Sequence, residues 1–115
     1  MANEDCIFCK IVKRKIKNEE VYRDEKVVVV KDIKPQAPVH LLLIPVVHFE
    51  TPADFIEAIE HVPGHMFVVA ARVAKQMGVA ESGYRLVVNV GHDGGQVIKH
   101  LHMHLMGGRR LRDDM

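Results

Sequence analysis

Apolar and polar residues follow one another along the first half of the chain in short runs that predict one helix and three strands. CIFCKIVKR, residues 6–14, has apolar residues at helical spacing and predicts a short helix. VYRDEKVVVVKD, residues 21–32, predicts two strands around a tight turn at 24–26, because its run of valines favours extended structure. VHLLLIPVVH, residues 39–48, is nearly continuously apolar, so we expect a third strand at the centre of the sheet.

Helical spacing returns in the middle of the chain. PADFIEAIE, residues 52–60, predicts a short helix that Pro63-Gly64 interrupts. HMFVVAARVAKQMG, residues 65–78, predicts a longer amphipathic helix that ends near its terminal glycine.

The last part of the chain reads as two strands. GYRLVVNV, residues 83–90, and KHLHMHLM, residues 99–106, predict a fourth and a fifth strand with a loop between them. The order of helix, three strands, helix and two strands predicts an α+β fold with a five-stranded, mostly antiparallel sheet and two main helices. By length, we expect residues 1–115 to form a single domain.

Composition narrows the class of protein. Apolar residues make up 48% of the chain and charged residues 27%, as in ordinary globular proteins. The net charge of +1 gives no electrostatic reason to expect a nucleic acid or an anionic membrane as partner. MANEDCIFCK shows no secretory pattern and no apolar run is long enough to span a bilayer, so we expect a cytoplasmic protein. Cys6 and Cys9 are then unsuited to a structural disulfide.

The stretch HLHMH contains the main candidate chemistry, because it places His100, His102 and His104 at every second position. On a strand these imidazoles share one face, with their Cα atoms about 6.5–7 Å apart. The residues between and after them are apolar and would fill the opposite face: Leu101, Met103 and Leu105. Three roles are open for such a row: hydrogen bonding within the fold, a metal site, or nucleophilic and acid–base chemistry at neutral pH.

The loop GHDGGQ leads directly into this histidine strand. Glycines permit positive φ angles and let backbone N–H groups approach an anion closely, and Asn89 adds a side-chain amide nearby. Such donors suit a phosphate, although a simple hairpin turn has the same composition. No P-loop motif is present and no acidic pair calls for magnesium, so we expect no magnesium requirement.

The motif KDIKPQAPVH, residues 31–40, contains two further candidate site residues. The carboxylate of Asp32 could accept hydrogen bonds from both hydroxyls of a ribose, or it could belong to a turn. His40 begins the predicted third strand and could be a fourth imidazole of the site.

The combination of HLHMHLM with IFCKIVKRKI, DIKPQAPVHLLLIP, GYRLVVN and GGQ resembles the histidine-triad (HIT) proteins over nearly the whole chain. Among them it is most similar to the Hint branch of purine nucleoside phosphoramidases. The resemblance implies that His102 attacks the α-phosphorus of a nucleoside phosphoramidate or an aminoacyl adenylate. Water would then release a nucleoside monophosphate from the covalent nucleotidyl-histidine.

The same resemblance assigns roles to other residues. It implies that His104 contacts a phosphate oxygen or the leaving group, that His40 lies beside the phosphate, and that His100 supports the site. Asp32 would bind the ribose. The phosphate would be held by Asn89, Gly95 and Gln96, and the purine, either adenine or guanine, by Phe8, Ile11, Val30 and Ile33. Val97 stands where many relatives have a serine, so only its backbone N–H could help to bind the phosphate.

The motif CxxC sets the chain apart from most Hint proteins. Cys6 and Cys9 could be two partly buried thiols or a redox pair. In some bacterial relatives and in related nucleotidyltransferases, such cysteines bind zinc together with two histidines that match His48 and His100 here. The resemblance thus implies a closed, structural zinc site, which leaves His102 and His104 for catalysis.

We expect an enzyme acting on purine nucleotides such as conjugates of AMP or GMP. Two alternatives remain open: a dinucleoside-polyphosphate hydrolase, and a nucleotide-binding or partner-binding module with little turnover.

We also expect a homodimer. Leu86 and Val88 would lie on one face of an edge strand, which invites pairing with another strand. The long helix has more apolar surface than one small sheet needs, at Met66, Phe67, Val69, Val73 and Met77. By resemblance, two copies would join their sheets into one of ten strands.

Overall fold

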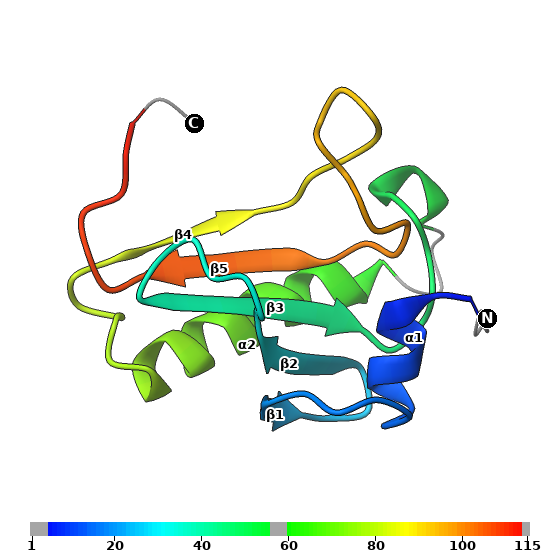
Figure 1. The fold of residues 1–115 in the computed structure, drawn as a ribbon, viewed down its shortest axis with the longest axis horizontal. Helices are drawn as coiled ribbons and strands as arrows, with labels where there is room; N and C mark the ends of the chain where they lie inside the picture. The colour runs from blue at the N-terminus through cyan, green and yellow to red at the C-terminus, as the bar shows by residue number, and fades with distance from the viewer. Residues whose placement is uncertain (1–4, 56–59, 114–115) are drawn as a thin grey trace.

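The computed structural model describes residues 5–55 and 60–113 and contains one twisted antiparallel sheet (Figure 1). Its strand order is β1-β2-β3-β5-β4. The strands are β1 (Glu20–Arg23), β2 (Val27–Lys31), β3 (Val39–Pro45), β4 (Tyr84–Val87) and β5 (Met103–Gly107). The predicted fold class is therefore confirmed, including the central position of β3 and the edge position of β4.

The helices lie on opposite faces of the sheet (Figure 1). They are α1 (Ile7–Val12) and α2 (His61–Gln76), with a 3-10 turn, η1 (Pro52–Asp54), between β3 and α2. None of the described helices is long and apolar enough to cross a membrane. Within the described residues, the short helix predicted at 52–60 is reduced to η1, and its residues 56–59 lie outside them.

Alternation along the central strands gives the sheet two apolar faces. Val27 and Val29 of β2 pack with the buried side of α2, whereas Val28 and Val30 pack with Phe8 of α1. Each of these valines is at most 1% exposed, and burying such a side chain stabilises the fold by about 1.5–3 kcal/mol. The run of valines therefore contributes to the hydrophobic core on the α2 side and to the one on the α1 side. The face toward α1 also carries the histidines.

The predicted interruption at Pro63 is wrong. Helix α2 begins at His61, so Pro63 and Gly64 lie in its first turn. Backbone N–H groups in the first turn have no partner within the helix, and a proline there removes no hydrogen bond. The predicted helix at 65–78 therefore starts one turn earlier.

Strand β5 begins at Met103 and not at Lys99, so His100 and His102 precede it. The pairing of β3 with β5 ends at Leu43 and Met103. Two residues further along β3 stands Pro45, which has no N–H to donate to the ladder. The side chains still alternate as predicted, because Leu101, Met103 and Leu105 belong to the core against α2.

Candidate active site

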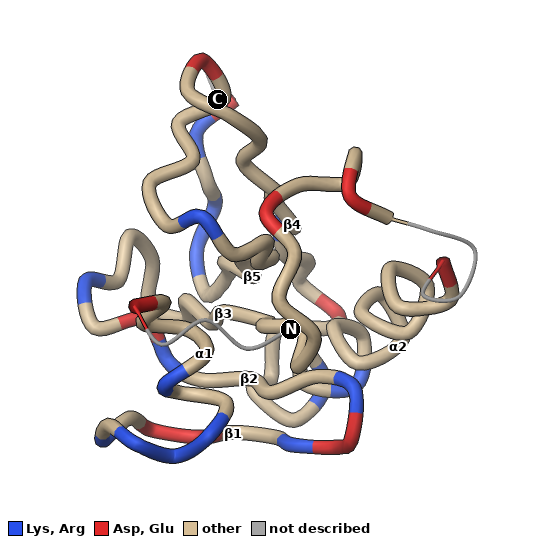
Figure 2. The backbone as a smooth tube through the Cα atoms, turned by 90° about the vertical axis from the view of Figure 1, so that its right-hand side faces the viewer, with Lys and Arg blue, Asp and Glu red and all other residues tan. Residues whose placement is uncertain are grey.

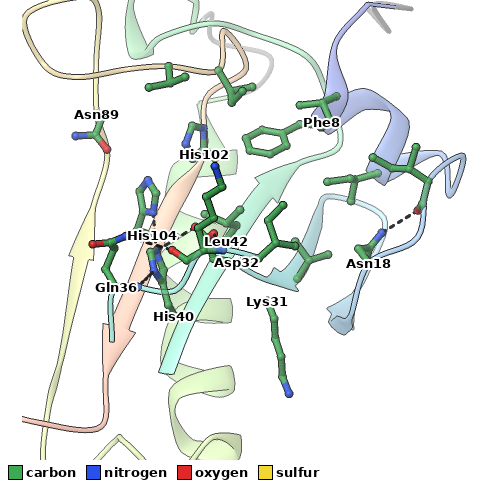
Figure 3. Close-up of a pocket in the computed structure, with 18 of the residues that line it drawn as sticks. Phe8, Asn18, Lys31, Asp32, Gln36, His40, Leu42, Asn89, His102 and His104 are labelled. Carbon is green, nitrogen blue, oxygen red and sulfur yellow. Dashed lines mark hydrogen bonds and ion pairs between the residues drawn. The ribbon is translucent and has the colours of Figure 1, made fainter. Parts of the chain in front are cut away.

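A cavity of about 730 Å³ opens on the α1 face of the sheet (Figure 3). Three of the histidines line it, His40 from β3, His104 from β5 and His102 from the segment before β5. Eight more predicted residues line the same cavity: Phe8, Ile11, Val30, Asp32, Ile33, Asn89, Gly95 and Val97. The register of β3 and β5 thus gathers residues that are far apart in the sequence.

His102 is buried and held in one orientation. Its Nδ1 donates a hydrogen bond of 2.8 Å to the backbone carbonyl oxygen of His100. A carbonyl only accepts, so in the neutral ring Nδ1 bears the proton and Nε2 keeps a lone pair. Phe8 packs edge-on against the imidazole, with 4.7 Å between ring centroids. Burial lowers the pKa of His102 and favours this neutral, nucleophilic form.

A chain of hydrogen bonds fixes the protons on His40 and His104. The backbone N–H of Gln36 donates to His40 Nδ1 over 3.0 Å, which places the proton of neutral His40 on Nε2. His40 Nε2 in turn donates to His104 Nδ1 over 2.9 Å. His104 therefore carries its own proton on Nε2, the atom that could donate to a substrate.

The electrostatic surroundings keep these two rings neutral. Burial, together with the nearby His102 and His40, lowers the pKa of His104 to about 4. Burial also lowers the pKa of His40, although Asp32 acts in the opposite direction from 3.4 Å. The unprotonated Nδ1 atoms of His40 and His104 both accept hydrogen bonds within the site, so at neutral pH Nε2 of His102 is the unprotonated nitrogen left for a substrate, and Nε2 of His104 is the N–H donor.

The loop before β5 is organised by two amides. Asn89 Nδ2 donates to the carbonyl oxygen of Gly94 over 2.8 Å, and Gly95 adopts a φ of 78°. Gln96 does not line the cavity. Its Oε1 accepts from Gly91 N over 2.9 Å and its Nε2 donates to Glu50 O over 2.7 Å, so it ties the loop to the segment after β3.

Two of the predicted residues lie at the rim of the cavity and contribute mainly apolar surface. Ile33 is 88% exposed and Val97 is 85% exposed, whereas Phe8 and Ile11 form a buried wall. The cavity is therefore open to solvent at Ile33 and Val97.

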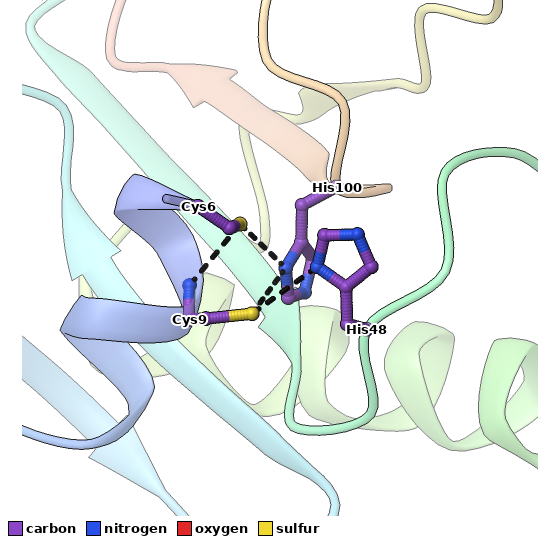
Figure 4. Close-up of side chains that lie close together, drawn as sticks. All are labelled: Cys6, Cys9, His48 and His100. Atoms are coloured by element: carbon purple, nitrogen blue, oxygen red, sulfur yellow. Dashed lines mark hydrogen bonds between the residues drawn. The ribbon is translucent and has the colours of Figure 1, made fainter. Parts of the chain in front are cut away.

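A second cluster joins α1 to the segments that follow β3 and precede β5 (Figure 4). Cys6, Cys9, His48 and His100 offer ligand atoms that all lie within 4.8 Å of one another. Cys9 Sγ is 3.1 Å from His48 Nδ1, and Cys6 Sγ is 3.3 Å from His100 Nδ1. The cysteines form no disulfide. All four predicted metal ligands converge.

The donor set fits a zinc ion. Sulfur and nitrogen ligands of a tetrahedral zinc site are about 3.5 Å apart, given bond lengths of about 2.3 and 2.0–2.1 Å. His100 Nε2 donates to the carbonyl oxygen of Pro45 over 2.9 Å, which leaves the lone pair of Nδ1 directed at both sulfurs. Burial raises the pKa of the Cys6 thiol, so a cation would be needed to hold it as a thiolate.

A further group of potential ligands, Asp32, His40 and His104, is less suited to a metal. The facing nitrogens of His40 and His104 already share a hydrogen bond of 2.9 Å, so one of them bears the proton. The described residues thus separate a cluster suited to a cation from a pair suited to proton transfer.

Comparison with known proteins agrees with this geometry. The HIT domain pattern matches residues 13–111. The chain belongs to the HIT domain family. It is 47% identical to the purine nucleoside phosphoramidase of Escherichia coli over 108 residues, covering 94% of this chain and 91% of that protein.

Solved structures of HIT proteins are similar over the full length. A histidine triad protein from Clostridium difficile superimposes with a TM-score of 0.96 at 37% identity, covering 100% of both chains. A HIT family hydrolase from Clostridium thermocellum superimposes with a TM-score of 0.94 at 41% identity, covering 98% of each chain. The predicted HIT resemblance and fold are confirmed.

Nine of the residues that line the cavity of this HIT protein were not assigned from the sequence, and Leu42, Gln36 and Asn18 are three of them. Leu42 lies two residues after His40 on the same strand face, a spacing that could have revealed it. Gln36 acts through its backbone N–H, which side-chain patterns do not show. Asn18 reaches the cavity from the segment between α1 and β1, where the sequence has no periodic signal.

Proposed function

We propose that this HIT protein is a hydrolase that cleaves the P–N bond of purine nucleoside phosphoramidates, or the acyl phosphate of aminoacyl adenylates, and releases a nucleoside monophosphate. The similarity of the chain to the purine nucleoside phosphoramidase of Escherichia coli supports the reaction. The observation that carries the proposal is the fixed tautomer of His102, whose unprotonated Nε2 belongs to a ring that lines the cavity.

In the proposed reaction His102 Nε2 forms a bond to the α-phosphorus as the bond to the leaving amine breaks. His104 donates its Nε2 proton to that amine, because its hydrogen bond from His40 fixes the proton there. Water then attacks the phosphorus of the nucleotidyl-histidine and gives its proton to His104 Nε2, the bond between phosphorus and His102 Nε2 breaks, and the monophosphate is released. Two easier displacements thus replace one difficult one.

Binding is assigned to residues around these histidines. Asp32 accepts hydrogen bonds from the ribose hydroxyls, and the base lies against Phe8, Ile11, Val30 and Ile33. Asn89, Gly95 and the backbone N–H of Val97 surround the phosphate, while Gln96 supports them by holding the loop in shape. These neutral donors need no magnesium.

We assign a structural zinc ion to Cys6, Cys9, His48 and His100. It would fasten α1 to the segments after β3 and before β5. Since Phe8 lies between the two cysteines in the chain and contacts His102, this anchor would also hold one wall of the nucleotide cavity.

Steady-state hydrolysis of an adenosine phosphoramidate is expected to exceed that of a diadenosine polyphosphate by at least about 100-fold in kcat/KM. The amine becomes a good leaving group once His104 protonates it. Higher activity on the dinucleotide would instead support a dinucleoside-polyphosphate hydrolase. Tight AMP binding without turnover of either compound would leave a nucleotide-binding or partner-binding module.

We further propose a homodimer formed by β4 and α2. β4 is an edge strand, and α2 exposes Phe67 and Val68, each 56% exposed, although Met66, Val69 and Val73 are used in the core. Pairing of β4 with its copy would build the ten-stranded sheet.

Light scattering at micromolar concentration is expected to give twice the chain mass of 13.0 kDa. Phe67→Asp/Val68→Asp should shift the protein toward the monomer, because the dimer would bury the new charges. Gln76→Asp, another charge placed on the same helix, serves as the control. A monomeric wild-type protein would contradict the proposal.

A cytoplasmic location, a single domain over residues 1–115 and the absence of a nucleic-acid partner remain predictions.

A further inference from the structure

Three arginines gather at the end of the sheet where β4 begins. Arg85 lies on β4, while Arg109 and Arg110 follow β5 in the basic stretch that leads toward the C-terminus (Figure 2). Together with residues 82–84 and Leu111 they line a hollow of about 210 Å³, which is separate from the nucleotide cavity. Neither the metal cluster nor the proposed reaction uses these side chains.

The strand register places Arg85 on the same face as the histidines. Arg85 pairs with Met106, and Met106 pairs on its other side with His40. The neighbours of Arg85 along β4, Tyr84 and Leu86, pack against the α2 core, so Arg85 projects from the opposite face.

Arg85 is also a close neighbour of His104. Val87 pairs with His104, and Arg85 lies two residues before Val87 on the same face. Diagonal neighbours on adjacent antiparallel strands have their Cβ atoms about 7–8 Å apart. A substituent that extends from a phosphorus atom beside His104 can therefore reach the arginine side chain.

A second contact connects the hollow with the histidines. Arg109 Nη2 donates to the carbonyl oxygen of Gln36 over 3.4 Å. The backbone N–H of the same Gln36 donates to His40 over 3.0 Å. The arginine hollow thus borders the His40–His104 pair.

The two sides of the site would receive different parts of the substrate. The purine is assigned to α1 and β2, and the sheet order puts β4 on the far side of β3 and β5 from them. In an in-line displacement the leaving group departs opposite the attacking atom, here His102 Nε2, and the same-face row of His102, His104 and Met106 leads from that atom toward Arg85. The side of β4 is where a large leaving group has room to lie.

The arginines already hold acceptors from the C-terminal segment. Arg85 Nη2 donates to the carbonyl oxygen of Arg112 over 2.6 Å, and Arg110 Nη2 donates to Asp113 Oδ1 over 2.8 Å. Arg110 and Asp113 are both mostly exposed, and exposed ion pairs contribute little to stability. A substrate carboxylate can therefore replace the one from Asp113.

We propose that Arg85 and Arg110 bind the side-chain carboxylate of an amino acid whose α-amine is the leaving group, so that phosphoramidates of acidic amino acids are the preferred substrates. The inference rests on the proposed phosphoramidase activity. Guanidinium groups suit this role because they bind carboxylates through paired, charge-assisted hydrogen bonds. Strand pairing in the proposed dimer uses backbone groups in the plane of the sheet, so it does not consume the guanidinium group of Arg85.

The test compares kcat/KM for three adenosine phosphoramidates whose leaving amines are glutamate, glutamine and lysine. Glutamate and glutamine differ in a single charged group, so their ratio isolates the side-chain carboxylate. We expect a ratio of about 10 in favour of glutamate, with lysine the poorest substrate. Arg85→Gln and Arg110→Gln should each bring the ratio toward one, and Arg85→Glu should favour lysine over glutamate. Lys26→Gln, which removes a positive charge at the opposite edge of the sheet, should keep the wild-type ratio.

A ratio near one in the wild-type protein, or a ratio that both arginine variants leave unchanged, would overturn the assignment while the phosphoramidase proposal stands. If the protein hydrolyses none of the three compounds and does not hydrolyse unsubstituted adenosine phosphoramidate either, the arginine assignment and the phosphoramidase proposal are both overturned. Because each variant is judged by a ratio measured on one preparation, a general loss of folded protein does not affect the result.

Discussion

His102→Ala is expected to lower kcat/KM for an adenosine phosphoramidate by at least about 1,000-fold and to change the Kd for AMP by less than about 5-fold. The proposed nucleophile is one atom, Nε2 of His102, and no neighbouring group can replace it. AMP, by contrast, would be held by contacts spread over Asp32, Asn89 and the apolar wall that contains Phe8.

The measurements are steady-state kinetics and calorimetric titration with AMP. His102→Asn is a useful second variant, because it retains a polar side chain against Phe8 and limits the cavity that alanine creates. His92→Ala removes a fully exposed histidine from the preceding loop and should behave like wild type. Near-normal turnover by His102→Ala would show that the nucleophile is a different group.

Metal analysis of protein purified without chelator is expected to find about one zinc per chain. Cys6→Ser/Cys9→Ser should bind none and should melt at least about 5 °C lower than wild type. The expected loss is large because one cation would join three segments through the two cysteines, His48 and His100. Without the cation, the same thiols and imidazoles remain as buried polar groups.

EDTA provides the matched comparison. It should lower the melting temperature of the wild-type protein toward that of the double variant, and it should not affect the variant. A metal-free wild-type protein whose melting temperature is insensitive to EDTA would reject the zinc site. The cluster would then be a set of hydrogen-bonded thiols and imidazoles.

Local patterns were sufficient to predict most of the fold. Helical spacing identified α1 and α2, the run of valines identified β2, and the nearly continuous apolar run identified β3, because these signals depend on neighbours a few residues apart. The ends of elements were predicted less well. The sequence predicts a break at Pro63, whereas helix α2 begins two residues before it. The sequence also predicts that β5 includes His100, whereas the strand begins at Met103, because Pro45 in the partner strand has no N–H to continue the hydrogen bonds between β3 and β5.

The sequence by itself determined that the three histidines at 100, 102 and 104 and the apolar residues at 101, 103 and 105 lie on opposite sides, because the alternation of an extended chain is a local property. It also contained the motifs that place the chain among the HIT proteins. Only the tertiary structure decided which groups meet. His40 reaches His104 through the β3–β5 register across 64 residues, and Cys6 reaches His100 across 94. Such encounters depend on how the strands pair and how α1 packs on the sheet, and no short-range pattern records them.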